Sequence, residues 1–357
     1  MLAKDFIVRK SEFDLNKSGK VSAKSPSNIA LVKYWGKTDP QIPTNPSISY
    51  TLTNSFTETT LSFEPKKADE LEIRVFLDEV EKTDFVPKIK KFFQRIEEYA
   101  PYLEDYDFTL HTHNSFPHSS GIASSASGMS ALSKCLIQME EELGYKVKNR
   151  LQRSSFLSRL GSGSACRSVY PGLVTWGESE FIEGSSDLYA IPLEKDIDIH
   201  PVFKAFNDTI LLIHEGTKSV SSTVGHQLMN NHPYAQLRFD EAKQNIKKLL
   251  EILKSGDLEA FGKLVEHEAL SLHAMMMLSD PAFILMKPNT VSALDKLWAF
   301  RKETGLPLFF TLDAGANIHL LYPDEGKEKI EAFIQSNLLP LCQNEGIIYD
   351  RANFEAL

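Results

Sequence analysis

The stretch Ser162-Gly163-Ser164-Ala165-Cys166-Arg167-Ser168 joins small residues directly to an arginine, just after a predicted helix over 151–160. Such a flexible Gly/Ser loop can wrap an anion with its backbone N–H groups, and a guanidinium can bind a carboxylate or phosphate through two hydrogen bonds. The stretch therefore predicts a site for a small anion. Most Gly/Ser loops bind nothing, so this prediction depends on three companion segments, at 27–37, 116–128 and 311–317.

Length and composition are those of an ordinary folded protein with an acidic balance. The chain has 357 residues, 42% hydrophobic and 24% charged, a length that predicts two domains. A formal charge of −9 argues against a nucleic-acid partner, which would require a basic face. Apolar runs fall short of the roughly 20 residues of a membrane span, and the N-terminus lacks a secretory core. With three cysteines, too few for a disulfide framework, we expect a reduced cytoplasmic protein without a membrane partner.

Periodicity predicts an α+β protein in two parts. Apolar residues at helical spacing predict a helix over 84–99, and partial alternation rich in Thr, Leu and Phe predicts strands over 47–63. A charged, turn-like segment near 194–201 marks a boundary, so we expect domains at 1–195 and 196–357. The second part runs strand, helices, two strands, helix and strand, which predicts a sheet with helices on one face.

The strongest candidate for a phosphate site is Phe116-Pro117-His118-Ser119-Ser120-Gly121-Ile122-Ala123-Ser124-Ser125-Ala126-Ser127-Gly128. Its small residues let a ligand approach the backbone, and the helix that follows directs unpaired N–H groups at it. Its hydroxyls can donate to phosphate oxygens or ligate Mg²⁺. The segment lacks the Gly-Lys-Ser/Thr sequence of the Walker-type P-loop. Tight packing of an Ala/Ser helix start is an equally weighted alternative.

Two further segments place charged residues in unusual surroundings. Asp313 falls on a Gly- and Ala-rich turn between apolar strands, where it either bonds its own backbone or acts as a base at a strand end. Lys33 and Lys37 lie among apolar and aromatic residues instead of on a surface of mixed charge. Solvated lysines, with Tyr34 and Trp35 as core aromatics, would explain the same pattern.

Together these segments resemble the signatures of one family, the diphosphomevalonate decarboxylases. The family's N-terminal signature is similar to Asn28-Ile-Ala-Leu-Val-Lys-Tyr-Trp-Gly-Lys37 followed by Pro43-Thr-Asn-Pro-Ser-Ile-Ser49, and its nucleotide-phosphate loop is similar to 116–128. Its two remaining signatures resemble Gly161-Ser-Gly-Ser-Ala-Cys-Arg-Ser168 and Asp313-Ala-Gly-Ala-Asn317. Four signatures in the same order are far more specific than any one of them.

The resemblance implies the GHMP-kinase fold, in which a ribosomal-S5-like N-terminal domain and a ferredoxin-like C-terminal domain flank an active-site cleft. It also implies ATP, Mg²⁺ and a homodimer. The implied reaction converts (R)-5-diphosphomevalonate and ATP to isopentenyl diphosphate, CO₂, ADP and phosphate, in the mevalonate pathway of isoprenoid biosynthesis. Phosphorylation makes the tertiary C3 oxygen a leaving group, and loss of CO₂ quenches the positive character that its departure leaves at C3.

The same resemblance implies a role for each matching residue. Asp313 matches the catalytic aspartate that orients, and can deprotonate, the C3 hydroxyl. Arg167 matches the arginine that grips the C1 carboxylate, and Lys33 a lysine that stabilises charge on the transferred phosphoryl group. Further substrate contacts are implied for Asn28, Tyr34, Lys37 and Ser164. ATP contacts are implied for Ser119, Ser120, Gly121, Ser124 and Ser125. No protein cluster for a metal is expected, because Mg²⁺ would enter with ATP, and Ser125 is a candidate ligand.

The chain also departs from the family pattern. The family usually has Pro-Thr-Ala-Ala-Gly where residues 117–121 are Pro-His-Ser-Ser-Gly, and Asp-Ala-Gly-Pro-Asn where this chain has Ala316. Lys88, Lys90 and Arg95 are candidates for the family's diphosphate-binding arginine, with a solvated helix face as the favoured explanation of all three. The number of phosphates at the 5-position therefore stays open. The alternatives are a mevalonate 5-phosphate decarboxylase and a mevalonate-type kinase.

Overall fold

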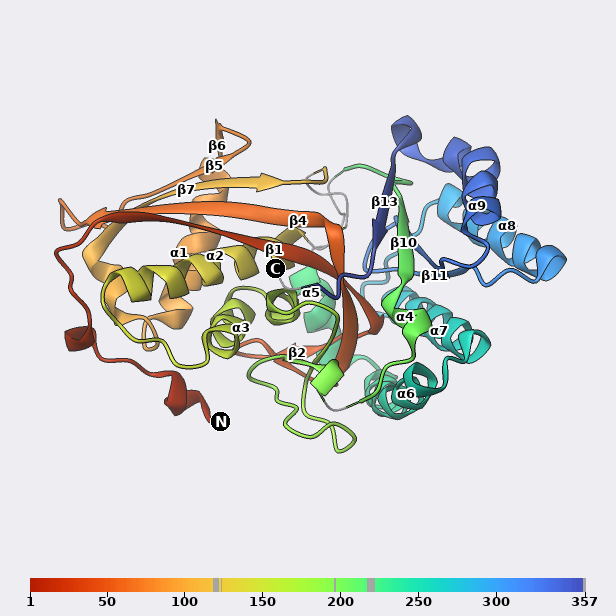
Figure 1. The fold of residues 1–357 in the computed structure, drawn as a ribbon, viewed down its shortest axis with the longest axis horizontal. Helices are drawn as coiled ribbons and strands as arrows, with labels where there is room; N and C mark the ends of the chain where they lie inside the picture. Colours follow the sequence, from red (N-terminus) through yellow and green to blue (C-terminus); the bar gives the residue numbers. More distant parts are fainter. Residues whose placement is uncertain (118–121, 123, 196, 217–221, 356–357) are drawn as a thin grey trace.

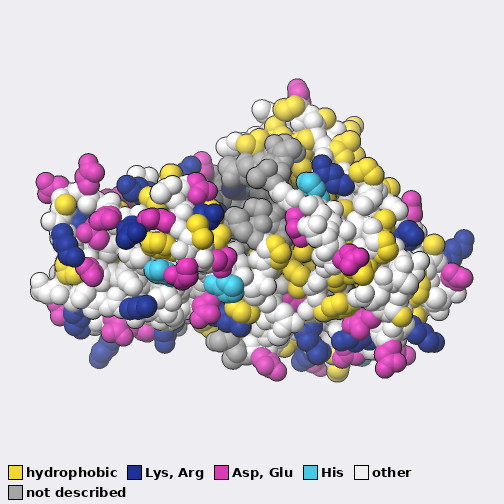
Figure 2. All heavy atoms as spheres, turned by 90° about the horizontal axis from the view of Figure 1, so that it is seen from above, with side chains coloured by type: hydrophobic (Ala, Val, Ile, Leu, Met, Phe, Trp, Pro, Cys, Tyr) yellow, Lys and Arg dark blue, Asp and Glu magenta, His cyan; other side chains and the backbone are white. Residues whose placement is uncertain are grey.

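Two β-sheets, each with its own helices, lie side by side along the long axis of the molecule (Figure 1). The computed structural model describes residues 1–117, 122, 124–195, 197–216 and 222–355. Mixed helices and strands in both halves confirm the predicted α+β class. In Figure 2, acidic and basic side chains are interspersed over the left half, and hydrophobic side chains are denser over the right half.

Strand β4 (Ser47–Pro65) is the centre of the first sheet. One edge of β4 pairs with β1 (Gly19–Val32), and its other edge pairs with β7 (Tyr106–Asn114) and β8 (Leu173–Trp176). The β1–β4 register shifts after Pro26, because proline has no N–H to donate to the ladder. β1 is therefore one irregular strand. The outer strands are β5 (Ile73–Leu77), β6 (Val80–Glu81) and β9 (Ile191–Pro192).

Helix α2 (Ser124–Glu142) packs closely on the first sheet because its buried positions carry small side chains. The hydroxyl of Ser130 lies 3.0 Å from that of Ser25 on β1, and the hydroxyl of Ser127 lies 2.7 Å from that of Thr57 on β4. Figure 1 shows α1 (Val86–Ile96) and α3 (Arg150–Gly161) beside α2 on one side of this sheet.

The second sheet has the strand order β11-β12-β10-β13, all antiparallel. Together with the chain order strand, helices, strand pair, helix and strand, this is the ferredoxin-like arrangement that was expected. Its strands are β10 (Phe206–Leu211), β11 (Phe309–Thr311), β12 (Ile318–Pro323) and β13 (Ile347–Arg351). The described helices in this part of the chain are α4 (Pro201–Lys204), α5 (Ser222–Leu228), α6 (Ala235–Ser255), α7 (Leu258–Met277), α8 (Pro288–Thr304) and α9 (Lys327–Phe333).

Several helix ends follow ordinary capping chemistry. Helix α6 ends at Gly256, whose left-handed φ of 78° costs glycine little, and the side chain of Asp257 caps α7 by accepting from the Ala260 N–H.

A ribbon of β2 (Lys37–Thr38) and β3 (Ile42–Pro43) follows β1. Short helical turns complete the fold: Ala3–Phe6, Lys10–Glu12, Thr83–Phe85, Pro101–Asp105, Gly163–Val169, Leu193–Lys195, Met229–Asn231, Ile334–Leu338, Leu339–Leu341 and Gln343–Glu345.

The two sheets meet where β4 bends. The carboxylate of Asp350 on β13 accepts hydrogen bonds from the backbone N–H groups of Thr53, Asn54 and Ser55 on β4, at 2.7–2.9 Å. The predicted boundary between 195 and 196 lies at the end of a short helical turn, and it stays a prediction. Within the described part of the chain, no helix combines the length and apolar character of a bilayer span.

Candidate active site

An ion pair joins the two halves of the chain at the predicted catalytic residues. Lys33 directly follows β1, and its Nζ lies 2.9 Å from Oδ1 of Asp313, two residues after β11. The Lys33 side chain is 2% exposed and that of Asp313 is 32% exposed. Burial lowers the pKa of Lys33, and the negative charges of Asp313 and Glu268 oppose that change. The fold therefore brings together two residues that lie 280 positions apart in sequence.

The Asp313 turn is held by hydrogen bonds to its main chain. The carbonyl of Asp313 accepts from the Gly315 N–H at 2.7 Å and lies 3.1 Å from Nε2 of His273. The hydroxyl of Thr290 donates to the carbonyl of Ala316 at 2.8 Å. Asn317, the last residue of the signature, accepts from the His214 N–H at 2.9 Å. These bonds orient the turn so that the Asp313 carboxylate faces Lys33.

Arg167 lies on a buried 3₁₀ helix, Gly163–Val169. The prediction of a flexible loop over 162–168 was therefore wrong. The small residues pack instead of bending freely, because Cys166 and Val169 join a core cluster around Trp176. The Arg167 side chain is fixed by Asn28 Oδ1, which accepts from Nε at 3.2 Å, and by the hydroxyl of Ser47, which accepts from Nη1. A buried, held guanidinium is preorganised to bind an anion.

The other predicted substrate residues surround Arg167. Asn28 donates to the hydroxyl of Ser168 at 2.7 Å and to the carbonyl of Ser164 at 3.3 Å. The ring of Tyr34 lies 5.7 Å from the Arg167 guanidinium, with Trp176 at its edge. Burial raises the pKa of Tyr34, which keeps its hydroxyl protonated as a donor. These contacts place Asn28, Tyr34, Ser164 and Arg167 in one cluster.

Lys37 lies among charged residues of both signs. Its Nζ donates to Oε1 of Gln41 at 2.8 Å. Burial lowers its pKa, the positive charges of Arg95 and Lys91 on α1 lower it further, and the negative charge of Asp39 opposes that change. Nη1 of Arg95 donates to the carbonyl of Leu160 at 3.1 Å, which holds Arg95 beside the start of the Ser162 stretch. Of the three predicted candidates on α1, Arg95 is the one whose charge lowers the pKa of Lys37.

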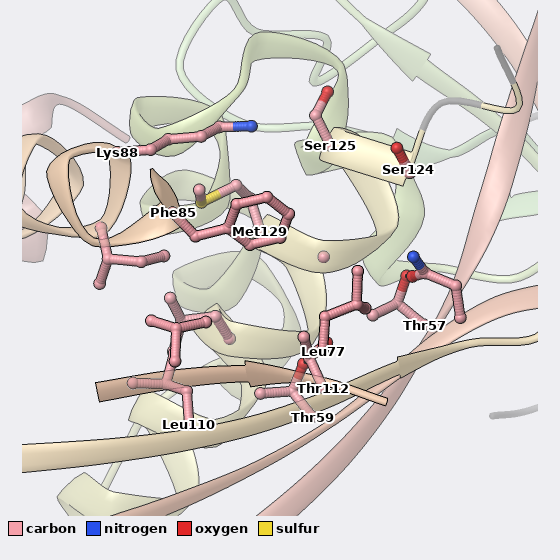
Figure 3. A pocket seen from close by; sticks show the side chains of 15 residues that line it. Thr57, Thr59, Leu77, Phe85, Lys88, Leu110, Thr112, Ser124, Ser125 and Met129 are labelled. Carbon is pink, nitrogen blue, oxygen red and sulfur yellow. The ribbon is translucent and has the colours of Figure 1, made fainter. Parts of the chain in front are cut away.

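A cavity of about 180 Å³ opens between α1, α2 and the first sheet (Figure 3). Ser124 and Ser125 at the start of α2 line it, and Lys88 of α1 extends toward them. Lys88 is exposed as a residue, but the cavity walls desolvate its ammonium and lower its pKa. Its other walls are apolar or carry hydroxyl and amide groups: Thr57, Thr59, Val75, Leu77, Phe85, Ile89, Leu110, Thr112, Asn114, Gly128, Met129 and Leu132.

The hydroxyls of α2 divide between the two predicted roles. Ser127 and Ser130 pack on the sheet, as the structural alternative predicted, but Ser124 and Ser125 line the cavity. The Ser125 hydroxyl lies 3.5 Å from that of Ser162, so the cavity adjoins the Arg167 helix. The predicted ATP residues Ser119, Ser120 and Gly121 lie outside the described residues. The described residues hold no group of three His, Cys, Asp or Glu side chains suited to a metal ion.

Sequence analysis missed the residues that hold Lys33 by its main chain. Glu268 Oε2 accepts from the Lys33 N–H at 2.8 Å, and Asn45 and Arg238 donate to the Lys33 carbonyl at 3.0 and 3.3 Å. Glu268 and Arg238 lie on the buried stripes of α7 and α6. The sequence signal that could have revealed them is a charged residue at a position where the helical pattern of α6 or α7 calls for an apolar one. Asn45 lies inside one of the quoted signatures.

Two protein-family models match this chain, one in each half. Residues 25–189 match the model of the diphosphomevalonate decarboxylase-like N-terminal domain, and residues 209–355 match that of the mevalonate 5-diphosphate decarboxylase C-terminal domain. The chain belongs to the diphosphomevalonate decarboxylase family. The family resemblance of the four signatures is thereby confirmed.

Relatives and solved structures of this family align along most of their length. A diphosphomevalonate decarboxylase from Ganoderma lucidum is 29% identical, covering 88% of this chain and 81% of that protein. A phosphomevalonate decarboxylase from Haloferax volcanii is 27% identical, covering 87% and 91%. The structure of MDDEF in complex with MVAPP, AMPPCP and magnesium has a TM-score of 0.81 at 27% identity, covering 94% and 98%.

A second solved structure confirms the fold class. The mevalonate diphosphate decarboxylase from Staphylococcus aureus has a TM-score of 0.80 at 27% identity, covering 95% of this chain and 97% of that one. The chain therefore has the GHMP-kinase type of fold that its signatures implied, with a ferredoxin-like second sheet.

Proposed function

We propose that this chain catalyses the ATP-dependent decarboxylation of (R)-5-diphosphomevalonate to isopentenyl diphosphate, with release of CO₂, ADP and phosphate. The observation that carries the proposal is the Lys33–Asp313 ion pair beside the buried Arg167. Phosphorylation of a hydroxyl needs a carboxylate and a cation at the reacting oxygen, and decarboxylation also needs a grip on a carboxylate. One site offers all three groups.

The chain's own residues account for the two halves of this chemistry. The Asp313 carboxylate, paired with the Lys33 ammonium, can accept a hydrogen bond from a substrate hydroxyl and orient it. Arg167, held by Asn28 and Ser47, can bind the C1 carboxylate until it leaves as CO₂. Departure of CO₂ then neutralises positive character at C3.

The residues around the α2 cavity fit ATP. Ser124 and Ser125 offer hydroxyls and the first N–H groups of α2, and Lys88 offers a cation at the same rim. The apolar walls below them suit an aromatic base (Figure 3). ATP would supply the phosphoryl group and Mg²⁺ would balance its charge. Ser125 is the candidate ligand for Mg²⁺ among the described residues, and homodimer formation stays a prediction.

The positive charges of Arg95 and Lys91, which act on Lys37 together with the negative charge of Asp39, favour a diphosphate at the 5-position. A diphosphate ester carries more negative charge than a phosphate ester, and the three cations outnumber the one anion. The similarity to a phosphomevalonate decarboxylase makes the 5-phosphate the substrate to test against it.

The deciding experiment incubates the purified protein with ATP, Mg²⁺ and one of three compounds: mevalonate, its 5-phosphate or its 5-diphosphate. We expect ADP and CO₂ in equal amounts, with the highest kcat/KM for the 5-diphosphate. ADP without CO₂ would identify a kinase. Equal or better turnover of the 5-phosphate would assign the protein to the monophosphate activity.

A further inference from the structure

Helix α7 reaches the main chain at both members of the Lys33–Asp313 ion pair. Glu268 accepts from the Lys33 N–H at 2.8 Å, and Nε2 of His273 lies 3.1 Å from the carbonyl of Asp313. A carbonyl can only accept, so Nε2 is the protonated nitrogen of His273. The two anchors are five residues apart on one helix, or about 7.5 Å along its axis. A single rigid element therefore contacts both sides of the ion pair.

Glu268 is itself fixed by two side chains of α6. Arg238 donates to both Glu268 oxygens, from Nη1 at 3.2 Å and from Nη2, and Asn245 donates to Oε1 at 2.6 Å. Glu268 is 0% exposed and Arg238 is 2% exposed. Arg238 also reaches the carbonyl of Lys33, so the Lys33 peptide is held at its N–H and its carbonyl. A two-point contact of this kind restricts both the position and the rotation of the residue.

A buried ion pair is a weak source of stability, because desolvation offsets most of its attraction. The Glu268–Arg238 pair joins α7 to α6, and both of its members also bond the backbone of one reactive residue, Lys33. Exact placement of reacting groups is worth far more to a reaction than to folding, since a shift of about 1 Å can cost about 10²-fold in rate. This contrast favours a role in catalysis.

We propose that Glu268 and His273 are positioning residues that set Lys33 against Asp313 from a shared helix. The inference rests on the proposed function, since it assumes that this ion pair acts on the substrate. Neither residue needs to touch the substrate for the effect. Glu268 acts through the main chain of Lys33, and His273 acts through the main chain of Asp313.

The charges that face Lys33 predict a specific signature. They are Asp313 after β11, Glu268 on α7, Arg167 on its 3₁₀ helix and, behind Glu268, Arg238 on α6. Loss of the Glu268 charge removes one anion and leaves the Arg238 cation unbalanced. Both changes disfavour a protonated Lys33, so its pKa falls, and activity that needs the ammonium is lost at lower pH.

The first test compares Glu268→Gln with Glu266→Gln on the same helix. Glu266 is also buried in an ion pair, but its carboxylate accepts from Arg301 and Trp298 of α8, whereas that of Glu268 accepts from the Lys33 peptide. We expect both variants to lose thermal stability. Only Glu268→Gln should lower kcat, by about 10²-fold with little change in the KM for ATP, and shift the alkaline limb of its pH profile to lower pH. Equal kcat and pH profiles in the two variants would overturn the proposal.

The second test uses His273. Glutamine can present an N–H donor near the position of an imidazole Nε2, but leucine cannot. We expect His273→Leu to lower kcat and His273→Gln to restore most of it. If both substitutions lower kcat equally, or if neither does, His273 has no positioning role.

A readout without turnover separates this inference from the proposed function. The pKa of Lys33 is measured by NMR of protein labelled at lysine Cε, with the resonance assigned from Lys33→Arg. We expect the Lys33 titration to move to lower pH in Glu268→Gln and to stay unchanged in Glu266→Gln, whether or not the wild type releases CO₂. An unmoved titration overturns the inference, and a wild type without CO₂ release overturns the proposed function alone.

Discussion

At the scale of single residues, burial decides what the predicted site residues can do. Lys33 is a lysine with 2% side-chain exposure, where burial lowers its pKa and the Asp313 carboxylate 2.9 Å away opposes that change. Arg167 is equally enclosed and is fixed by two polar side chains. Each charge is therefore held in a low-dielectric place, where a charge interacts strongly with any group that lies beside it. The same residues on a surface would be solvated and screened.

Substitution of Asp313 by Asn should abolish turnover and largely spare ATP binding. The amide keeps the shape of the side chain but loses the charge that orients a hydroxyl, so we expect kcat to fall by about 10²–10⁴-fold. ADP release measures kcat, and calorimetry measures the Kd for ATP. Asp295→Asn, on the exposed face of α8, is the control and should behave as wild type. Near-normal turnover of Asp313→Asn would remove Asp313 from the mechanism.

The value of kcat should also fall at a lower alkaline pH than the ordinary pKa of a lysine would predict. Burial lowers the pKa of Lys33 from its ordinary value of 10.5, so the ammonium is lost at a lower pH than in an exposed lysine. If the ammonium is needed, kcat falls as the pH rises through that lowered pKa. We expect this alkaline limb to disappear from the residual activity of Lys33→Arg, because a guanidinium stays charged up to about pH 12. The check is kcat against pH, and an identical limb in Lys33→Arg would exclude Lys33 as its source.

At the scale of elements, the helices of the first half combine packing and binding on different faces. Helix α2 turns Ser127 and Ser130 to the sheet and Ser124 and Ser125 to the cavity. Helix α3 carries Arg153 inward, where Nη2 and Nε donate to the buried carboxylate of Glu140 on α2 at 2.6 and 2.7 Å. This pair fixes the two helices relative to each other near the C-terminal end of α2, away from the end that carries Ser124 and Ser125.

Removal of the Arg153 charge should therefore be costly to folding. Arg153→Met leaves the Glu140 carboxylate buried without its cation, so we expect the free energy of unfolding to fall by about 3–5 kcal/mol. Arg150→Met is the matched control on the same helix, because its pair with Glu141 is largely exposed. It should cost about 0–1 kcal/mol. Urea unfolding measures both, and similar losses would show that the buried pair has no special weight.

At the scale of the whole molecule, the site exists because two sheets are joined firmly. Lys33 comes from the first sheet, and Asp313 and helix α7 belong to the second part. Beyond the Asp350 contacts, Leu52 and Ala352 form an isolated antiparallel bridge, and the Asn353 N–H donates to the carbonyl of Thr51 at 2.8 Å. The residues that directly follow β13 thus pair with β4 near its bend.

Loss of the Asp350 carboxylate should loosen this joint. Asp350→Ala leaves three backbone N–H groups of β4 without their acceptor, so we expect the free energy of unfolding to fall by about 1–3 kcal/mol or more. Asp350→Asn keeps one accepting oxygen and should lose less. Calorimetry should also show a broader transition for Asp350→Ala as the two halves unfold less cooperatively. A wild-type unfolding curve for Asp350→Ala would mean that other contacts hold the joint.

The elements themselves were largely predictable because their patterns are local. The α1 helix follows from apolar residues at helical spacing, and the Gly256–Asp257 junction follows from capping chemistry. The stretch around Arg167 was predicted wrongly as a flexible loop, because a run of small residues does not reveal whether a core surrounds it. Glu268 and Arg238 were missed for a related reason: a charge on a helix is ordinarily solvated, and only its position on the apolar stripe argued otherwise.

The sequence by itself determined the fold class, the family and the residues able to carry the chemistry, because residue types in a fixed order are local information. The tertiary structure alone decided which of these residues meet. Lys33 and Asp313 are separated by 280 positions and pair only when the two sheets dock. Their distance and charge depend on buried partners from α6 and α7. Distances and dielectric surroundings are properties of packing, which no local pattern contains.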